Sequence, residues 1–195
     1  MRTLSKVYDT YGQARQVVTD LHAAGVADSK ISLVANKHVA AEYEDLDEYS
    51  ETAAGAGLGA AVGGAGGLLA GLGIIAIPGV GPVVAAGWLA ATLVGALAGA
   101  AAGGVVGALV DAGVSKDDAE VYSEAIRRGG TLVTVRAEDS EASRVQAILD
   151  RHQPIDPMSR RDEYARAGWK GYDPTAKPYD LSEAERERIR TPYPR

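Results

Sequence analysis

The sequence predicts an α+β fold: a ferredoxin-like β-α-β-β-α-β domain with an inserted apolar Gly/Ala-rich antiparallel helical hairpin. Outside residues 52–110, strand-like and helix-like patterns alternate in the order β-α-β, helix, β-α-β. Inside residues 52–110 no side chain is charged, and glycine recurs at every fourth position in two series. We expect five segments: the first half of the domain (1–41), an acidic linker (42–51), a glycine-zipper helical hairpin (52–114), the second half of the domain (115–158) and a charged tail rich in proline and tyrosine (159–195).

The first half of the domain begins with a β-rich run at residues 3–8. Thr10 and Gln13 then match a capping box, and apolar residues follow at helical spacing. Gly25 stands where a helix commonly ends, and residues 31–35 predict a second strand. These elements form a β-α-β unit of the size expected for two parallel strands and a crossover helix.

The linker at residues 42–51 carries six carboxylates, which could be a metal site or a solvated charge run. Their spacing favours the solvated linker. The carboxylates nearest Thr52 are also placed to stabilise the N-terminal end of a helix that begins there.

The uncharged stretch of the hairpin, residues 52–110, has 59 residues, of which 17 are glycine, 18 are alanine and 19 are leucine, isoleucine or valine. Because a missing Cβ lets two helix backbones approach closely, we expect the glycine series to be packing faces. Leu89, Leu93 and Leu97 should face outward, toward lipid or the next subunit. The packing residues are Gly55, Gly59, Gly63, Gly67 and Gly71 in the first arm and Gly87, Gly95, Gly99, Gly103 and Gly107 in the second. The turn between the arms is predicted at Pro78, Gly79, Gly81 and Pro82.

The second half of the domain repeats the pattern. A helix capped by Ser115 ends at Gly129-Gly130, a strand follows at residues 131–136, and another helix begins at Asp139-Ser140. Residues 153–158 predict a short edge strand, because the two prolines there are tolerated only at a sheet edge.

The tail contains large aromatic side chains that usually cover a surface. Trp169 and Tyr172 are therefore candidates for docking on the domain or on a neighbouring subunit, and a disordered tail is the alternative. Ser182 and Glu185 match the cap of a short helix that runs to Arg190.

The residues give no catalytic, cofactor-binding or metal-binding motif. Cysteine is absent, the three histidines are isolated in sequence, and no phosphate-loop sequence occurs. The glycine matches at residues 55–59 follow an acidic linker rather than a strand, which argues against a dinucleotide site. A net charge of −6 argues against nucleic acid. We expect a protein that is not an enzyme and has no small-molecule substrate.

The sequence resembles bacterial general stress proteins of the heat-induced type, some of which are low-temperature-induced. The resemblance rests on residues 30–34 (KISLV), the Gly/Ala-rich stretch, residues 127–135 (RRGGTLVTV) and residues 168–174 (GWKGYDP). It implies a stress-associated, non-enzymatic role and supplies no active-site residues. Shorter members lack the hairpin, so the family does not explain that stretch.

The apolar surface of the predicted hairpin must be shielded from water. Each arm would be about 39 Å long as a helix, which exceeds the hydrocarbon thickness of a bilayer. Neither arm has a polar face, so we expect that a small α/β domain cannot cover the pair alone. Two coverings remain: membrane lipid, or other copies in a homo-oligomer. We expect a bacterial inner-membrane protein whose soluble domain is cytoplasmic, and a cytoplasmic homo-oligomer is the alternative.

Overall fold

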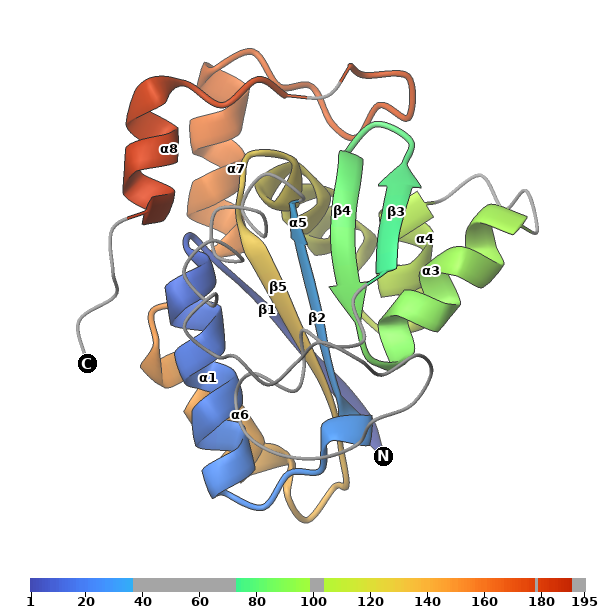
Figure 1. The fold of residues 1–195 in the computed structure, drawn as a ribbon, viewed down its shortest axis with the longest axis vertical. Helices are drawn as coiled ribbons and strands as arrows, with labels where there is room; N and C mark the ends of the chain where they lie inside the picture. Colours follow the sequence, from blue (N-terminus) through green and yellow to red (C-terminus); the bar gives the residue numbers. More distant parts are fainter. Residues whose placement is uncertain (37–72, 99–103, 178, 191–195) are drawn as a thin grey trace, which may run out of the picture.

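The computed structural model describes residues 1–36, 73–98, 104–177 and 179–190. These residues form one five-stranded antiparallel sheet with helices on both faces (Figure 1). The strand order is β1-β5-β2-β4-β3. The α+β class expected from the sequence is confirmed.

The first half of the domain contains β1 (Arg2–Tyr8), α1 (Tyr11–Ala23), the short 3-10 helix η1 (Asp28–Lys30) and β2 (Ile31–Asn36). The expected capping box is present at the start of α1. The Thr10 hydroxyl oxygen accepts from the Gln13 N–H, and the Gln13 side-chain oxygen accepts from the Thr10 N–H. β5 lies between β1 and β2 and is antiparallel to both, so β1 and β2 run in the same direction without touching.

The second half contains α5 (Lys116–Arg127), β5 (Thr131–Ala137) and α6 (Ala142–Arg151). The Ser115 hydroxyl accepts from the Asp118 N–H at the start of α5. At its end Gly129 has φ +94°, a left-handed conformation that glycine adopts without strain.

The expected edge strand at residues 153–158 is wrong. One backbone hydrogen bond, from Ile155 N–H to the Val7 carbonyl (2.7 Å), holds this segment beside β1. Pro154 has no N–H with which to continue a ladder. Pro157 takes the first position of α7 (Pro157–Arg166), and the Asp156 carboxylate caps that helix by accepting from the Ser159 N–H.

The expected helical conformation of residues 73–77 and 82–86 is also wrong. β3 (Gly73–Ile77) and β4 (Gly81–Ala86) form an antiparallel β-hairpin, and β4 pairs with β2. Four of these residues, Ile74, Ile75, Val83 and Val84, are β-branched and fit a strand better than a helix. The predicted turn residues thus join two strands: Pro78 and Gly79 lie in the connection, whereas Gly81 and Pro82 begin β4.

The second arm is helical only after β4, in α3 (Trp88–Ala98) and α4 (Gly104–Asp111). Gly87 is not on a helix face. It has φ +83° at the junction of β4 and α3, where an added Cβ would overlap the Ile31 carbonyl oxygen. Gly95 lies in α3 and Gly107 in α4. The remaining predicted packing glycines lie outside the described residues: Gly55, Gly59, Gly63, Gly67, Gly71, Gly99 and Gly103.

Two apolar cores lie on opposite faces of the sheet. One is formed with α1 and α6, and the other with α3, α4 and α5. Successive side chains of β5 point to opposite faces of the sheet. Leu132 therefore lies in the core formed with α3, α4 and α5, which we call the second core, and Val133 lies in the core formed with α1 and α6.

Ten described residues of the uncharged stretch are buried in the second core, so the expectation that the domain cannot cover the stretch is wrong for these residues. Leu89 and Leu93, expected to face outward, are each only 1 % exposed. The buried members from the stretch are Ile77, Val80, Val83, Ala85, Leu89, Leu93, Val105, Val106, Ala108 and Leu109.

Among the described residues, no helix has both the length and the apolar character needed to cross a bilayer.

His152 is largely buried at the C-terminal end of α6. Its Nε2 lies 2.9 Å from a carboxylate oxygen of Asp20 in α1, and the Arg151 guanidinium lies 3.2 Å from the same oxygen. The hydrogen bond to His152 is the main cause of a lowered Asp20 pKa, and Arg151 adds to it.

We predict that Gly87→Ala and Gly107→Ala have opposite effects. At Gly87 alanine must adopt a left-handed conformation, which costs about 1–2 kcal/mol before the overlap with Ile31 is counted. At Gly107 no described atom lies within 4 Å of the added Cβ, so the better helix propensity of alanine should add up to about 1 kcal/mol. Urea unfolding measures both. Equal destabilisation would mean that Gly107 packs against a second helix, as the glycine-zipper interpretation requires.

We predict that Asp20→Asn removes an acid-sensitive part of the stability. A carboxyl whose pKa is lower in the folded state stabilises the fold above its unfolded-state pKa of about 3.9. That contribution is lost as the pH falls through the lower folded-state pKa. The variant should therefore be less stable than the parent at pH 7, and the difference should shrink below about pH 4. Urea unfolding between pH 7 and pH 2.5 tests this, with the exposed Asp180→Asn as control; a gap independent of pH would contradict it.

Candidate functional site

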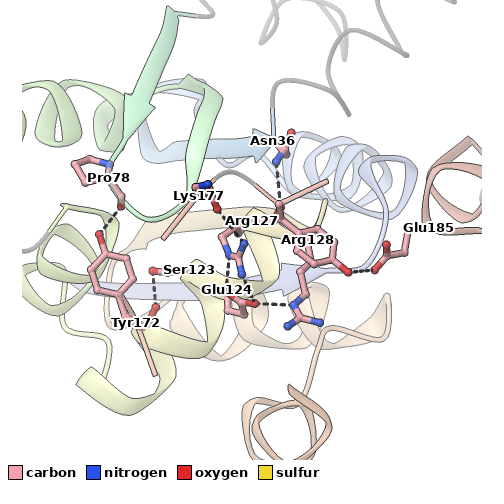
Figure 2. A network of polar contacts seen from close by, with 11 residues as sticks. Asn36, Pro78, Ser123, Glu124, Arg127, Arg128, Tyr172, Lys177 and Glu185 are labelled. Atoms are coloured by element: carbon pink, nitrogen blue, oxygen red, sulfur yellow. Dashed lines mark hydrogen bonds and ion pairs between the residues drawn. The ribbon is translucent and has the colours of Figure 1, made fainter. Parts of the chain in front are cut away.

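The C-terminal tail lies across α5 and the β3–β4 turn, and its last described element is α8 (Glu183–Arg190) (Figure 1). The structure places both predicted docking residues of the tail on the chain's own domain. Trp169 is partly buried against the core formed with α3, α4 and α5. The Tyr172 hydroxyl donates a 2.6 Å hydrogen bond to the Pro78 carbonyl in the β3–β4 turn (Figure 2).

The central polar group of this site is Glu124, on the face of α5 that meets the tail. Its side chain is only 5 % exposed. Arg127 Nε lies 2.8 Å from one carboxylate oxygen, and Arg128 Nε lies 2.6 Å from the other (Figure 2). Arg127 also donates from Nη1 to the Lys177 carbonyl of the tail. One buried carboxylate thus orients two guanidinium groups, one of which holds the tail backbone.

Tyrosines of the tail stack on the same two arginines. The Arg128 guanidinium carbon lies 4.5 Å from the ring centroid of Tyr164 and 5.0 Å from that of Tyr179. Arg127 lies 5.2 Å from the Tyr179 ring. Such cation–π contacts contribute about 0.5–2 kcal/mol each. We call Glu124, Arg127, Arg128, Tyr164 and Tyr179 the arginine–tyrosine cluster.

Tyr164 is fixed by burial, and Tyr179 is fixed by a hydrogen bond within the tail. Burial raises the pKa of Tyr164 to about 12, so its hydroxyl stays neutral near pH 7. The Tyr179 hydroxyl lies 3.0 Å from a Glu185 carboxylate oxygen. Two residues after Tyr179, the buried side chain of Leu181 belongs to the core formed with α1 and α6. The tail therefore bridges both cores of the domain.

The turn and the tail also touch through their backbones at Gly79. A Cβ added there would overlap the Asp173 carbonyl and would lie 2.9 Å from the Cα of Pro174. Gly79 has φ +73°, which also favours glycine. Two separate constraints therefore select glycine at this position.

A cavity of about 270 Å³ lies between α5, the tail and the β3–β4 turn. Along α5 it is lined by Glu120, Ser123, Glu124 and Arg127, which share one helix face. The tail supplies residues 168–173 and Ala176, which include the aromatic Trp169 and Tyr172 and the charged Lys170 and Asp173. Polar side chains from α5 and aromatic ones from the tail make this cavity the candidate binding site of the described part of the chain.

The described residues do not include three histidine, aspartate or glutamate side chains grouped so that they could hold a metal ion. The site is made of ion pairs, aromatic rings and backbone carbonyls, groups that commonly orient a ligand in a binding pocket.

The arginine–tyrosine cluster was not found from the sequence. A signal was present, because Glu124, Arg127 and Arg128 stand at the i, i+3 and i+4 positions that place them together on a helix. Such a pattern usually marks an exposed ion pair, however, and nothing local indicates that a tail about fifty residues away will cover it.

Comparisons with protein-family models, with curated proteins and with solved structures find no match for this chain.

We predict that Gly79→Ala releases the tail. The substitution should cost more than the roughly 1–2 kcal/mol of a left-handed alanine, because the turn must also move away from Asp173. Hydrogen exchange over residues 168–177, followed by mass spectrometry, should become faster. Gly25→Ala is the matched control, since Gly25 has φ +82° and no described atom near its added Cβ. It should lower stability without changing exchange in the tail; equal exchange in both variants would contradict the prediction.

Proposed function

We propose that this chain is a non-enzymatic structural protein that assembles with further copies of itself through the uncharged edge of its sheet. The observation that carries the proposal is the position of β3. It stands last in the strand order and pairs with β4 on one side only. On its other side, no described strand uses its backbone N–H and C=O groups.

Such an edge favours strand pairing between molecules. Proteins that stay monomeric commonly protect an edge strand with lysine, proline or a bulge. β3 has the sequence GIIAI, which contains none of the protective side chains. Two copies of β3 aligned antiparallel would satisfy each other's backbone groups and extend the sheet across a two-fold axis.

The resemblance to bacterial general stress proteins supports a stress-associated role for such an assembly. The topology supports a ferredoxin-like interpretation of the domain core as well. β1, α1 and β2 are followed by β5 and α6, and Ile155 is hydrogen-bonded beside β1, where a fourth strand would stand. In this interpretation the uncharged stretch and α5 are inserted between the second strand, β2, and the third strand, β5.

Membrane association is the second candidate, and it is favoured by a separate observation. Residues 52–72 are 21 consecutive uncharged residues, which is close to the number that a bilayer-spanning helix requires. Eight of them are glycine and only five are leucine or valine, so the drive for insertion is weak. This candidate places the protein at the bacterial inner membrane with its α/β domain in the cytoplasm, whereas self-assembly alone leaves it in the cytoplasm.

We predict that the detergent-free protein is larger than its 20.2 kDa monomer and that Ala76→Lys reduces its size. Ala76 is an exposed residue of β3, and a lysine there places a charge at the proposed interface. Sedimentation velocity measures the size of the assembly. Ala165→Lys, at an exposed position of α7, is the matched control and should leave the size unchanged.

Flotation with vesicles of anionic and neutral lipid separates the two candidates. A protein that is monomeric without lipid and floats with vesicles would support the membrane candidate and refute the first. A monomer that does not float would refute both.

A further inference from the structure

We propose that β3 pairs with β3 of one second copy in a single register, with Ile75 on the two-fold axis, and that the assembly closes at two chains. This inference rests on the proposed function, because it names the partner and the register at the same sheet edge. It follows from three features: the direction of the backbone groups of β3, the residues at which its free edge ends, and the contacts at the opposite edge of the sheet.

Two residues of β3 direct their backbone groups away from the sheet. Residues opposite each other in an antiparallel ladder alternate between hydrogen-bonded and non-hydrogen-bonded pairs. Ala76 lies opposite Pro82, which has no N–H to donate. The neighbouring Ile77 carbonyl accepts from the Val80 N–H and is thus directed toward the turn into β4. The pair that contains Ala76 is therefore non-hydrogen-bonded, so Ala76 and Ile74 direct their N–H and C=O groups outward.

The opposite edge of the sheet agrees with this alternation. Carried through the registers of β4, β2 and β5, it directs the carbonyls of Ser5 and Val7 in β1 outward. Both carbonyls accept from groups outside the sheet. The Val7 carbonyl accepts from the Ile155 N–H at 2.7 Å. The Ser5 carbonyl accepts from the Tyr122 hydroxyl at 3.5 Å. A strand added along β1 would have to displace both contacts, so β1 is a poor partner for β3.

The free edge of β3 is short. Gly73 is the first residue of the strand. At the other end Pro78 has no N–H, and its carbonyl accepts from the Tyr172 hydroxyl of the tail (Figure 2). Within the described residues, the edge therefore offers the N–H and C=O groups of Ile74 and Ala76.

One register uses all of these groups. If Ile74 of each copy lies opposite Ala76 of the other, each of the two pairs exchanges both of its hydrogen bonds, and Ile75 lies opposite Ile75 of the second copy. A shift that places Ala76 opposite Ala76 would put Ile74 opposite Pro78, which cannot donate. The reverse shift would put Ala76 opposite residue 72, which precedes the strand. Because β3 carries no charge, the pairing brings no like charges together.

Such a pairing closes after two chains, because the same edge is used on both copies. The two outer edges of the joined sheet are then both β1, where the central carbonyls already have donors. The expected particle is about 40 kDa, twice the 20.2 kDa of one chain.

Single-cysteine cross-linking tests the register, because the chain contains no cysteine of its own. The Cα atoms of a non-hydrogen-bonded pair lie about 4.5 Å apart, within the range of a disulfide, so Ile75→Cys should give a covalent dimer with oxidised glutathione. In Ala76→Cys the two Cα atoms would lie on the diagonal, about 7–8 Å apart, which is too far for efficient bridging. Ala165→Cys, at an exposed position of α7, is the matched control for random collision.

A mixture of Ile74→Cys and Ala76→Cys chains is the second test, and it serves if Ile75→Cys fails to fold. In the proposed register these two positions lie opposite each other with Cα atoms about 5.5 Å apart. The mixture should therefore cross-link, whereas neither variant should cross-link alone. Rapid cross-linking of Ala76→Cys by itself, or no cross-linking of both Ile75→Cys and the mixture, would overturn the register.

Sedimentation velocity of the parent without oxidant separates this inference from the proposed function. A particle of about 40 kDa, twice the 20.2 kDa chain, is expected. A larger particle would overturn closure at two chains and leave self-assembly standing. A dimer that fails the cysteine tests would overturn the register and leave self-assembly standing. A monomer would refute both proposals.

Discussion

The pairing of β4 with β2 is the interaction on which the rest of the structure depends. Leu33 to Asn36 face Val83 to Ala86 across this ladder. Because β4 joins the sheet here, β3 becomes the outer strand and α3 and α4 are directed onto the same face as α5. The burial of the apolar side chains of β4, α3 and α4 follows from this one contact, and the domain itself covers surface that would otherwise need lipid or a second copy.

The same pairing positions the tail. The β3–β4 turn is carried to the end of α5, where the Pro78 carbonyl meets Tyr172 and the Gly79 backbone meets Asp173. The tail then continues over Arg127 and Arg128 to Leu181 in the other core. Residues from three distant parts of the sequence thereby enclose one cavity. None of these parts would form it alone, because each contributes only one wall.

Local signals predicted the local structure, and long-range pairing decided the rest. The Thr10–Gln13 capping box, the Ser115 cap and the strand at residues 131–136 depend on neighbouring residues, and all are present. The prediction of helix at residues 73–77 and 82–86 was wrong for the opposite reason. Their glycine and alanine content suggested packed helices, but the strand conformation depends on pairing with β2, which is distant in sequence. Gly87 fell on the four-residue glycine spacing only because the stretch is rich in glycine. In the structure it joins β4 to α3 with a left-handed backbone conformation. For the site, the sequence indicated Trp169 and Tyr172 but neither Glu124 nor the cavity, because burial of Glu124 depends on the tail.

The arginine–tyrosine cluster explains why the tail takes one position rather than many. Placing Glu124, Arg127 and Arg128 under the tail removes water from three charges, and the desolvation cost offsets much of the attraction among them. The cluster therefore adds little net stability compared with an apolar contact of the same size. Its directional contacts nevertheless accept only one arrangement, since Lys177 must present its carbonyl to Arg127 while Tyr179 lies over both guanidinium groups. A tail held only by apolar side chains could slide along α5. Because this one cannot, the tail residues that line the cavity stay beside α5, and the cavity keeps a fixed shape.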